Sequence, residues 1–566
     1  MKLNKIIISA GLVATLGLGA CTGDLDLTPT NPTDLTPEKF AGDPSKYMEE
    51  TMAGIYLEFA TYGPNGNNVL GSMDGGMSTF QRALFNLEEI PTDECNWLPS
   101  ADAIDANVQY GVITSSTQAV AGTYARLMVN VALCNNYLQT DFGASTEAQR
   151  AEYEEFCRQC HILRGASYYY LIDLFGNVPW ASPETAVGSI PPQLNTNFAE
   201  GRRAVFDNAV AELEEVVAWY KANDPNNKPK YGYVGLDAAE ALLVKYYLNA
   251  EVYTGTAQWG KCLEHANAII ARLGKGGHEG SGLCYAYHQN FGYNNKDFVL
   301  GNDASSINEI IWAIPQASPT LNNGEGLISY ANGGFMCNAW IGDAPGDATF
   351  FCKQADYNSG NGWKCMSARR QFVETFDWDA DYTYSPDIRT QFWKTAADGF
   401  NIENGVLDQA NWGNNGFLAV KYTNWIIDDG GNIAAGEQPQ PVDPLGIDYA
   451  MIRLAEIYLS AAEAALNGAG SASDALKYVN YIRTRAGLEG YTSLNLVELQ
   501  NERTRELYTE CIRRTDLIRY GKWISGYNWN WKNKVASGAD YAPAFVVYPL
   551  PTTVVTRNGY VQNPGW

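Results

Sequence analysis

The stretch that decides the fold lies near the C-terminus, where residues 449–466 read YAMIRLAEIYLSAAEAAL and residues 473–486 read SDALKYVNYIRTRA. Apolar side chains recur in both stretches with helical spacing, and Gly468 and Gly470 lie in the turn between them. The many alanines would let two helices pack closely against each other. A helix–turn–helix of this kind is typical of a tetratricopeptide-like unit.

The same periodicity predicts further helices on both sides of this pair. They cover residues 118–140, 147–175, 204–221, 236–253, 258–273 and 496–519. Residues 236–253 carry small residues at Ala238, Ala239 and Ala241, which favour close helix packing. In the last helix Glu510 stands four residues before Arg514, a spacing that supports a helix.

Between the helical parts, residues 274–447 are dense in glycine, asparagine, aspartate and tryptophan, with short β-like pieces such as residues 309–314. A loop-rich segment of this length is usually functional. The sequence thus predicts a predominantly α fold: an α-solenoid scaffold of tetratricopeptide-like helix pairs with a large loop-rich insertion containing short β-strands. The expected division is 1–20 signal peptide, 21–45 tether, 46–273 N-terminal helical part with binding loops, 274–447 insertion, and 448–566 C-terminal helices and tail.

The N-terminus has the pattern of a bacterial lipoprotein signal. Lys2 and Lys5 precede an apolar run at residues 6–18, and residues 18–21 read LGAC, which matches a lipobox. We therefore expect cleavage before Cys21, acylation of that cysteine and anchoring of the mature chain to a membrane through lipid alone. The alternative is an ordinary secretory signal with a coincidental cysteine.

Composition limits the class of ligand. The formal net charge of −24 argues against nucleic acid and against an anionic lipid surface as partners. Aromatic residues make up 12% of the chain, with 35 Tyr and 15 Trp, which is more than a core alone needs. Most cysteines lie in helical patterns among apolar neighbours, whereas Cys337, Cys352 and Cys365 share one loop-rich stretch and could pair in any combination.

Several motifs in a fixed order resemble the SusD/RagB family, the surface glycan-binding lipoproteins of nutrient-uptake systems. The resemblance runs from the lipobox to the last residue. Its motifs are RGASYYYL at 164–171, FGNVP at 175–179, ALL at 241–243, YLNAEVY at 247–253, IRLAEIYL at 452–459, NYIRTRAG at 480–487, ERTREL at 502–507, RRTDLIR at 513–519, YPLP at 548–551 and QNPGW at 562–566.

This resemblance implies a protein that binds oligosaccharides without covalent chemistry and closes over a SusC-like TonB-dependent outer-membrane transporter. It also implies an outward-facing position on the outer membrane, with Asp24 and Asp26 similar to the family's acidic export signal. Some relatives are associated with peptides, so a peptide ligand is the serious alternative within the same architecture. A pure protein-interaction scaffold is a further possibility, because stacked helix pairs commonly bind peptides.

A sugar site needs aromatic faces for stacking and polar groups for the hydroxyl rim. The loop of residues 62–106 offers such a set, and by resemblance to family members we predict Asp74, Arg82 and Trp97 as ligand-binding residues. The alternative is that Trp97 caps the helical core and the polar residues are solvated.

The insertion supplies further candidates, Tyr330, Trp340 and Trp363, which stand among glycine and asparagine and could serve as stacking platforms. Trp312 differs, since its apolar strand-like neighbours predict a core position. Arg369 and Arg370 could reach ligand hydroxyls, but an ion pair with Glu374 is the safer interpretation.

Other patterns carry less weight. Residues 157–161 read CRQCH, a haem-attachment pattern, yet they lie within a predicted helix whose packing a haem would displace. Residues 377–381 alternate aspartates like a calcium loop but lack its glycine and glutamate, so we expect no metal and no cofactor, although structural calcium is possible. A glycoside hydrolase is the less favoured enzymatic alternative, because no nucleophile motif supports catalysis.

Overall fold

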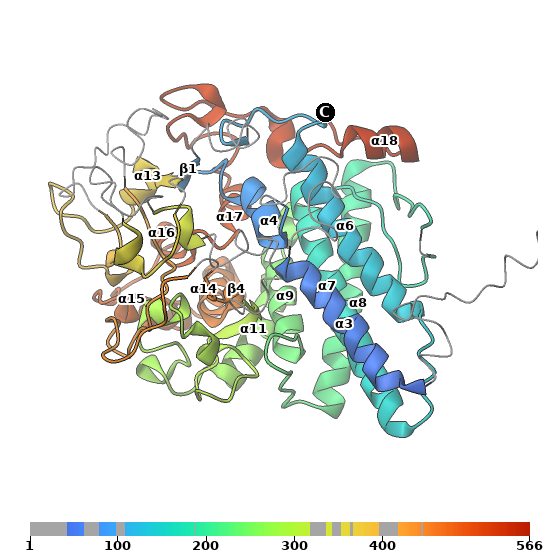
Figure 1. The fold of residues 1–566 in the computed structure, drawn as a ribbon. Helices are drawn as coiled ribbons and strands as arrows, with labels where there is room; N and C mark the ends of the chain where they lie inside the picture. Colours follow the sequence, from blue (N-terminus) through green and yellow to red (C-terminus); the bar gives the residue numbers. More distant parts are fainter. Residues whose placement is uncertain are drawn as a thin grey trace, which may run out of the picture. The chain divides into compact units, whose positions relative to one another are not determined.

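The computed structural model describes residues 42–61, 78–97, 108–186, 188–316, 336–341, 353–362, 366–394, 417–442 and 445–566. Helices dominate these residues, and the strands among them are short (Figure 1). The prediction of a predominantly α fold is therefore confirmed. The described residues fall into two compact units, the smaller of which comprises residues 42–53 and 140–156.

The smaller unit contains the N-terminal parts of α3 (Pro44–Ala60) and α7 (Glu147–Phe175). Within it, the ring of Phe142 packs against Tyr153 of α7 with ring centres 6.1 Å apart. Because Phe142 is buried, this contact holds the turn before α7 in place. All other described residues belong to the larger unit.

The N-terminal helices of the larger unit lie close to where the sequence predicts them. They are α6 (Gln118–Gln139), the remainder of α7, α8 (Phe198–Asn223), α9 (Leu236–Leu248), α10 (Ala250–Thr254) and α11 (Trp259–Leu273). Helix α8 begins earlier than predicted because the Asn197 side chain caps it, accepting a hydrogen bond from the Glu200 backbone N–H at 3.2 Å. The predicted helix over residues 236–253 is divided at Asn249, whose backbone is not helical.

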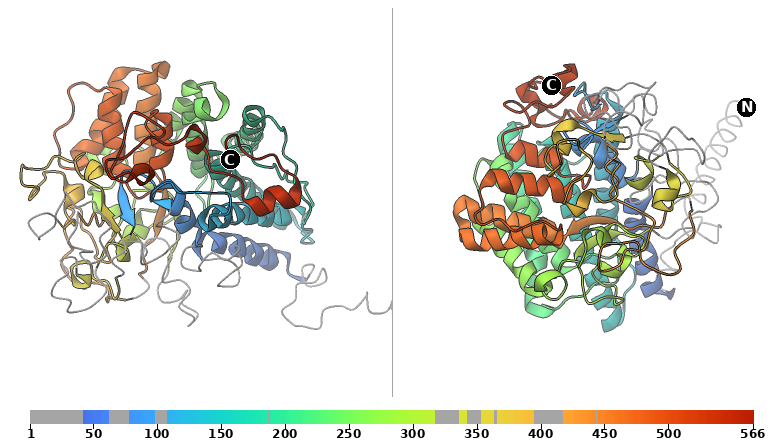
Figure 2. Two further views of the ribbon diagram at one scale, coloured as in Figure 1. Left: turned by 90° about the horizontal axis from the view of Figure 1, so that it is seen from above. Right: turned by 90° about the vertical axis from the view of Figure 1, so that its left-hand side faces the viewer.

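These helices pack in succession. Helix α8 packs on α9, α9 on α11, and α11 on α14 (Leu454–Ala464), which packs in turn on α15 (Ala472–Arg485). Figure 2 shows α14 and α15 lying side by side in both views. The small residues Ala238, Ala239 and Ala241 of α9 are buried, as their predicted packing role requires. The stacked pairs match the predicted tetratricopeptide-like scaffold.

The start of the predicted helix over residues 449–466 is wrong. Residues Tyr449–Arg453 form strand β4, which pairs antiparallel with β2 (Ile310–Ile314), and the helix begins only at Leu454. Every residue of both strands is buried, so the apolar run that resembles a helix is a strand covered on both faces. The β-like character of residues 309–314 and the core position of Trp312, which is buried, are confirmed.

The last predicted helix is also interrupted. It consists of α16 (Leu496–Leu507) and α17 (Arg513–Arg519), and between them Thr509 and Cys511 adopt positive φ angles of 61° and 60°. The expected helical pair of Glu510 with Arg514 is therefore wrong. Glu510 instead binds Arg453 and Lys421, both at 2.6 Å.

The remaining described elements are short, and many lie within the insertion. They are α4 (Phe80–Glu88), β1 (Cys95–Trp97), η2 (His278–Gly280), η3 (Tyr287–Asn290), η4 (Asn295–Phe298), η5 (Gln354–Tyr357), β3 (Met366–Ala368), α13 (Arg370–Val373), η6 (Ile388–Thr390), the π-helical η10 (Ala465–Ala469), η11 (Lys532–Lys534), η12 (Pro543–Val546) and α18 (Thr552–Asn558). Strands β1 and β3 pair antiparallel, with Cys95 opposite Ala368 and Trp97 opposite Met366. Strand β3 of the insertion thus pairs with β1, which precedes the insertion. Strand β2 of the insertion pairs with β4, which follows it. The domain boundaries themselves stay a prediction.

A buried ion-pair network connects the insertion to the C-terminal helices. Its centre is Glu506 of α16, which lies 3.4 Å from an Arg389 nitrogen and 3.1 Å from an Arg453 nitrogen, and which also accepts a hydrogen bond from Arg485. Glu309 beside β2 and Glu502 of α16 are the other shared acids. All six side chains are 0% exposed.

Charges withdrawn from water in this way need every partner, because removing one leaves the others uncompensated. The carboxyl of Glu309 illustrates the balance: burial alone would raise its pKa, but Arg485 and Arg453 lower it to about 2. The network therefore holds ionised groups deep in the protein at neutral pH.

The cysteines of the described helices are placed as expected, since Cys134 and Cys262 are both buried. Cys337 is buried as well, whereas Cys352 and Cys365 lie outside the described residues, so their pairing stays open. Cys21, Asp24 and Asp26 also lie outside them. A search of the described helices finds none that is long and apolar enough to span a bilayer.

Candidate functional site

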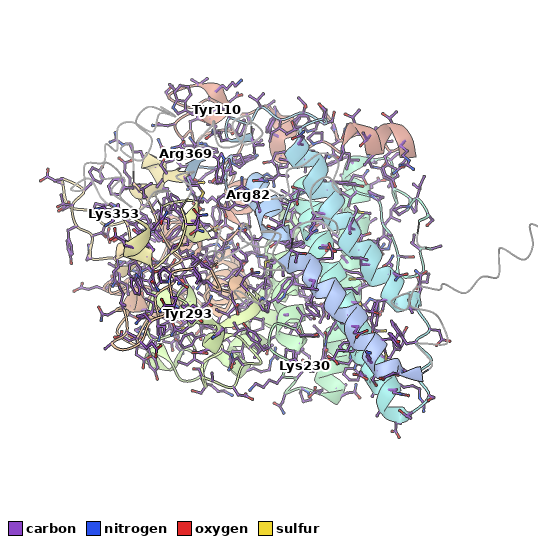
Figure 3. The ribbon with its side chains drawn as sticks, viewed as in Figure 1. Arg82, Tyr110, Lys230, Tyr293, Lys353 and Arg369 are labelled. Atoms are coloured by element: carbon purple, nitrogen blue, oxygen red, sulfur yellow. The ribbon has the colours of Figure 1, made fainter. Side chains whose placement is uncertain are left out.

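The structure brings two of the predicted ligand residues together. Arg82, which Figure 3 labels, lies in α4 and Trp97 lies in β1. The guanidinium carbon of Arg82 is 4.0 Å from the centre of the Trp97 ring. The prediction that residues 62–106 are one loop is wrong for this part of the chain, because a helix and a strand carry the two residues. Asp74 lies outside the described residues.

Both side chains are buried, with Arg82 2% and Trp97 1% exposed. Gln109 fixes the backbone of Trp97, accepting from its N–H at 3.0 Å and donating to its carbonyl oxygen at 2.8 Å. The Nε of Arg82 donates to Asn86 at 2.7 Å. In this conformation Arg82 and Trp97 pack inside the protein, as the alternative of a core-capping Trp97 describes. The ligand-binding role of the two residues stays a prediction.

The guanidinium of Arg369 contacts the same region of the protein. The sequence does not reveal this role of Arg369. Arg369 is buried and donates from Nε to the Cys95 carbonyl oxygen at 3.0 Å, and it also donates to the carbonyl of Asn530 (Figure 3). It thus holds strand β1 in place. Its neighbour Arg370 pairs with Glu374 at 2.7 Å, so the expected ion pair is confirmed for Arg370 and wrong for Arg369.

The candidates from the insertion are only partly described. Trp340 is 1% exposed, and its backbone N–H donates to the Cys337 carbonyl oxygen at 3.2 Å. Tyr330 and Trp363 lie outside the described residues. The ligand roles of all three stay predictions.

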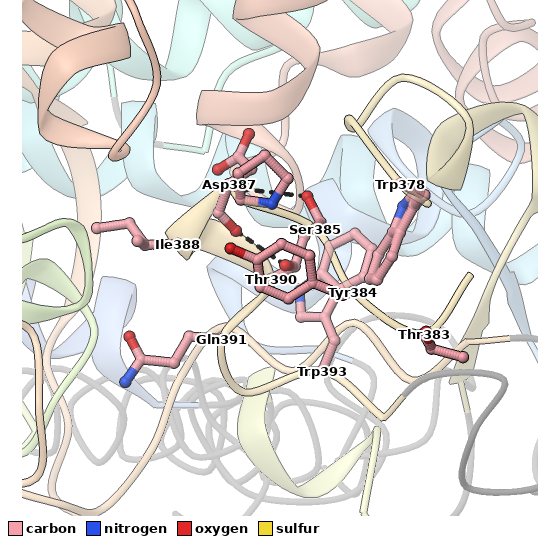
Figure 4. A pocket seen from close by; sticks show the side chains of 10 residues that line it. Trp378, Thr383, Tyr384, Ser385, Asp387, Ile388, Thr390, Gln391 and Trp393 are labelled. Atoms are coloured by element: carbon pink, nitrogen blue, oxygen red, sulfur yellow. Dashed lines mark hydrogen bonds between the residues drawn. The ribbon is translucent and has the colours of Figure 1, made fainter. Parts of the chain in front are cut away.

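A pocket of about 430 Å³ opens elsewhere in the insertion, and its volume lies within the range of roughly 300–1,000 Å³ that is usual for ligand sites. All of its described lining residues come from a single segment of the chain (Figure 4). Its lining residues are Trp378, Thr383, Tyr384, Ser385, Pro386, Asp387, Ile388, Thr390, Gln391 and Trp393.

Three aromatic side chains line this pocket in a gradient from buried to exposed. Trp393 is 5% exposed, and its Nε1–H donates to the hydroxyl of Tyr508 at 3.2 Å. The half-buried Trp378 lies with its ring centre 6.0 Å from that of Trp393, and its Nε1–H donates to the Val373 carbonyl oxygen at 3.0 Å. Tyr384 is 66% exposed. The inner rings are therefore fixed, and the outer ring presents a face to solvent.

Hydroxyl and amide groups also line the pocket (Figure 4). The Thr383 hydroxyl donates to Asp379 at 2.5 Å and the Thr390 hydroxyl donates to the Asp387 carbonyl oxygen at 2.8 Å. Each of these oxygens keeps acceptor capacity for a ligand hydroxyl. Gln391 is exposed and offers both a donor and an acceptor at the opening.

The one carboxylate of the lining is engaged inside the protein. Asp387 is 1% exposed and binds Arg389 through both oxygens, at 2.8 and 2.7 Å. Its backbone N–H donates to Ser385 at 3.2 Å. This lining therefore provides stacking and hydrogen bonding but no pair of carboxylates for acid–base chemistry.

The floor of the pocket is tied to the helical scaffold. The backbone N–H of Ile388 donates to the Ala486 carbonyl oxygen at 3.1 Å, and Nε2 of His288 lies 2.9 Å from the Ile388 carbonyl oxygen. Burial lowers the pKa of His288 to about 4, so its imidazole is neutral at pH 7. Hydrogen bonds between uncharged groups therefore hold Ile388 in place, and the ion pairs of Arg389 hold the neighbouring residue Asp387.

The acidic stretch before the pocket is an ordinary turn. Hydrogen bonds from the hydroxyl and the backbone N–H of Thr383 lower the pKa of Asp379, which keeps this exposed carboxylate ionised. Among the residues that the structure describes, no group of three or more His, Cys, Asp or Glu side chains could hold a metal ion. Sequence reasoning noticed the aspartates here and missed the pocket, although Trp378, Tyr384 and Trp393 within a polar run were the available signal.

Comparisons with known proteins agree with this fold. Residues 308–566 match the model of the SusD family. The starch-binding protein SusD of Bacteroides thetaiotaomicron is 28% identical over an alignment of 612 residues that covers 100% of this chain and 99% of that protein.

Solved structures with the same fold include surface glycan-binding protein A from Bacteroides fluxus, with a TM-score of 0.63 and 15% identity. A laminarin-binding SusD-like protein has a TM-score of 0.60 and 17% identity. Each comparison covers 92% of this chain and 99% of the other. The match of residues 308–566 to the SusD family model, the similarity to SusD along the whole chain and the SusD-like fold confirm the resemblance to the SusD/RagB family that the sequence motifs indicate.

Proposed function

We propose that this protein binds an oligosaccharide without altering it and delivers it to a SusC-like TonB-dependent transporter in the outer membrane. The observation that carries the binding part is the pocket lined by a half-buried Trp378, an exposed Tyr384 and several hydroxyl groups. Sugar rings present apolar C–H faces that stack on such rings, and a rim of hydroxyls that both donate and accept. The starch-binding and laminarin-binding relatives support the same ligand class.

A peptide ligand fits the described residues less well. Extended peptides commonly bind by adding a strand to an exposed sheet edge. In the part of the chain that the structure describes, the residues of both two-stranded sheets are buried. The pocket instead offers side chains from one loop, which suits the rings and hydroxyls of a sugar.

Binding without catalysis is supported by the state of Asp387. A glycosidase needs two carboxyl groups at a set separation, one of them able to exchange a proton. Asp387 is held by Arg389 in a two-point ion pair and is the only carboxylate of the described lining. The proposal therefore assigns recognition and no bond cleavage to this pocket.

The proposed route of delivery depends on the lipid anchor at Cys21. An anchored binder stays beside its transporter, which raises the effective concentration of captured glycan there. We expect the full chain to incorporate a labelled fatty acid in bacterial cells, and Cys21→Ala to abolish that labelling. Cys262→Ala, at a buried helical position, serves as the control and should keep the label. Equal labelling of both variants would contradict the anchor.

Binding itself is testable on the soluble form that lacks residues 1–21. We expect retardation in affinity electrophoresis by at least one polysaccharide of a panel containing starch, laminarin and xylan. Tyr384→Ala should raise the dissociation constant by about 10- to 100-fold, because truncating a stacked aromatic ring forfeits roughly 1.5–3 kcal/mol.

Tyr285→Ala is the matched control, since Tyr285 is a tyrosine of similar exposure, 47%, outside the pocket lining. Retardation by no glycan would refute the proposed function. Equal retardation of both variants would refute the pocket as the site.

A further inference from the structure

The described pocket lining carries no positive charge. None of its ten residues is lysine, arginine or histidine, and Asp387 is its one carboxylate. Recognition of sulfate, phosphate or uronate groups by proteins normally relies on arginine or lysine, whose charged hydrogen bonds are about twice as strong as neutral ones. The lining thus lacks the groups that an anionic sugar requires.

The cation nearest in sequence to the floor is not available to a ligand. Arg389 is 0% exposed, and its guanidinium binds Asp387 at 2.7 Å, Glu502 at 2.8 Å and Glu506 at 3.4 Å. An incoming anion would have to displace these buried acids. Breaking such buried pairs is costly, so this guanidinium stabilises the fold and does not bind a ligand.

The rim of the pocket is negative. Residues 377–393 contain four aspartates and one arginine, and the exposed Asp379 lies beside the opening, where it accepts the hydroxyl hydrogen of Thr383. Lys394, at the end of this segment, pairs with Asp356 at 3.2 Å. Arg370, before it, pairs with Glu374. The described cations that flank the segment are therefore matched by acids, and the aspartates remain in excess.

We infer that this pocket selects uncharged oligosaccharides and discriminates against uronate-bearing or sulfated ones. The inference rests on the proposed function and names the ligand class of the same site. A neutral sugar finds aromatic faces at Trp378 and Tyr384 and hydrogen-bonding partners at Thr383 and Gln391. An anionic substituent would lose water without gaining a counter-charge, next to Asp379.

Matched ligands give the sharpest test. The neutral polysaccharide that retards the soluble form is compared with its own carboxymethyl and sulfated derivatives, for example laminarin with laminarin sulfate. We expect affinity for the charged derivative to be at least about tenfold lower, as for a charged group left without a partner. Affinity for the neutral polymer should change less than about twofold between 0.05 and 0.5 M NaCl, because no ion pair forms with it.

A charge-gain variant tests the cause. Gln391→Lys places a cation at the opening and should raise the ratio of charged to neutral affinity several-fold. Thr553→Lys adds the same charge at an exposed position of α18 and should leave that ratio unchanged. A rise of equal size in both variants would show that net charge, and not the pocket, sets the preference.

The outcomes separate the two proposals. Equal or tighter binding of the charged derivative, or binding of polygalacturonate but of no neutral glycan, would overturn the inference and leave glycan binding intact. Failure to bind any neutral or charged polysaccharide would instead overturn the proposed function.

Discussion

Replacing Glu506 with glutamine should lower the free energy of unfolding by about 3–5 kcal/mol, because it removes one acid from a fully buried ion-pair network. Glu506 faces Arg389 at 3.4 Å and Arg453 at 3.1 Å and accepts a hydrogen bond from Arg485. Glutamine keeps the size and one acceptor but not the charge. Three guanidinium groups would then have one carboxylate fewer to balance their charge in a fully buried region.

The measurement is urea unfolding of the soluble form, followed by tryptophan fluorescence. Glu374→Gln is the matched control, since Glu374 pairs with Arg370 at the surface and such pairs contribute about 0–1 kcal/mol. Similar midpoints for the two variants would mean that the buried network does not hold the insertion to α16.

Stability should also fall as the pH rises through the range set by Glu94, and this fall should be smaller in Glu94→Gln, where only the buried Glu89 still contributes to it. Burial raises the pKa of Glu94 from 4.5 to about 7, although Glu94 also accepts a hydrogen bond from the Thr509 backbone N–H at 3.0 Å. Burial and the neighbouring Glu94 also raise the pKa of Glu89 well above its usual range. Two acids here share one dry site at the junction with the C-terminal helices.

The sign of this pH dependence follows from whether the folded or the unfolded chain holds the proton of Glu94. Below pH 4.5 both the folded and the unfolded chain carry it, so the stabilisation is fully present. As the pH rises, the unfolded chain releases the proton first, and unfolding becomes more favourable until the folded group also ionises near pH 7. A pKa raised from 4.5 to about 7 corresponds to about 3 kcal/mol of stability lost above pH 7.

The difference between the two proteins isolates this contribution. His288 acts in the opposite direction, because burial lowers its pKa to about 4 and its contribution to stability is lost as the pH falls through that range. Subtracting the unfolding free energy of Glu94→Gln from that of the wild-type protein at each pH cancels the His288 contribution. A difference that stays constant from pH 5 to about 8 would contradict the assignment, and Glu374→Gln provides the reference for a surface glutamate.

Most helices of this protein could be predicted from the sequence because apolar residues recur in them with helical spacing. Helix α8 follows that pattern, with Val205, Ala209 and Val216 buried on one face. The exceptions have tertiary causes. Residues Tyr449–Arg453 are buried on both faces by pairing with β2, so their apolar run carries no period that distinguishes strand from helix.

The break between α16 and α17 could not be predicted for a similar reason. The backbone N–H groups of Thr509 and Ile512 donate to Glu94 and Glu89, which lie more than 400 residues earlier in the chain. A helix-favouring local sequence is overridden there by distant buried acids. The same long-range contacts explain why the Glu510 pairing was misjudged.

The candidate site was harder to predict than the fold. Arg82 and Trp97 do lie together, but sequence does not distinguish a ring that awaits a ligand from one that Arg82 already covers. The exposure of Tyr384 depends on a loop whose shape is set by Asp379 and by the Ile388 backbone bonds. Such geometry has no periodic signature in the chain.

The two short sheets limit how this protein could be re-engineered by exchanging segments. Strand β3 of the insertion pairs with β1, and β2 pairs with β4, so each of these insertion strands has its partner outside the insertion. A chimera that grafted only residues 274–447 from a relative would bring two foreign strands against native partners. Swapping specificity would therefore require transplanting Cys95–Trp97 and Tyr449–Arg453 with the insertion, as one recombination block.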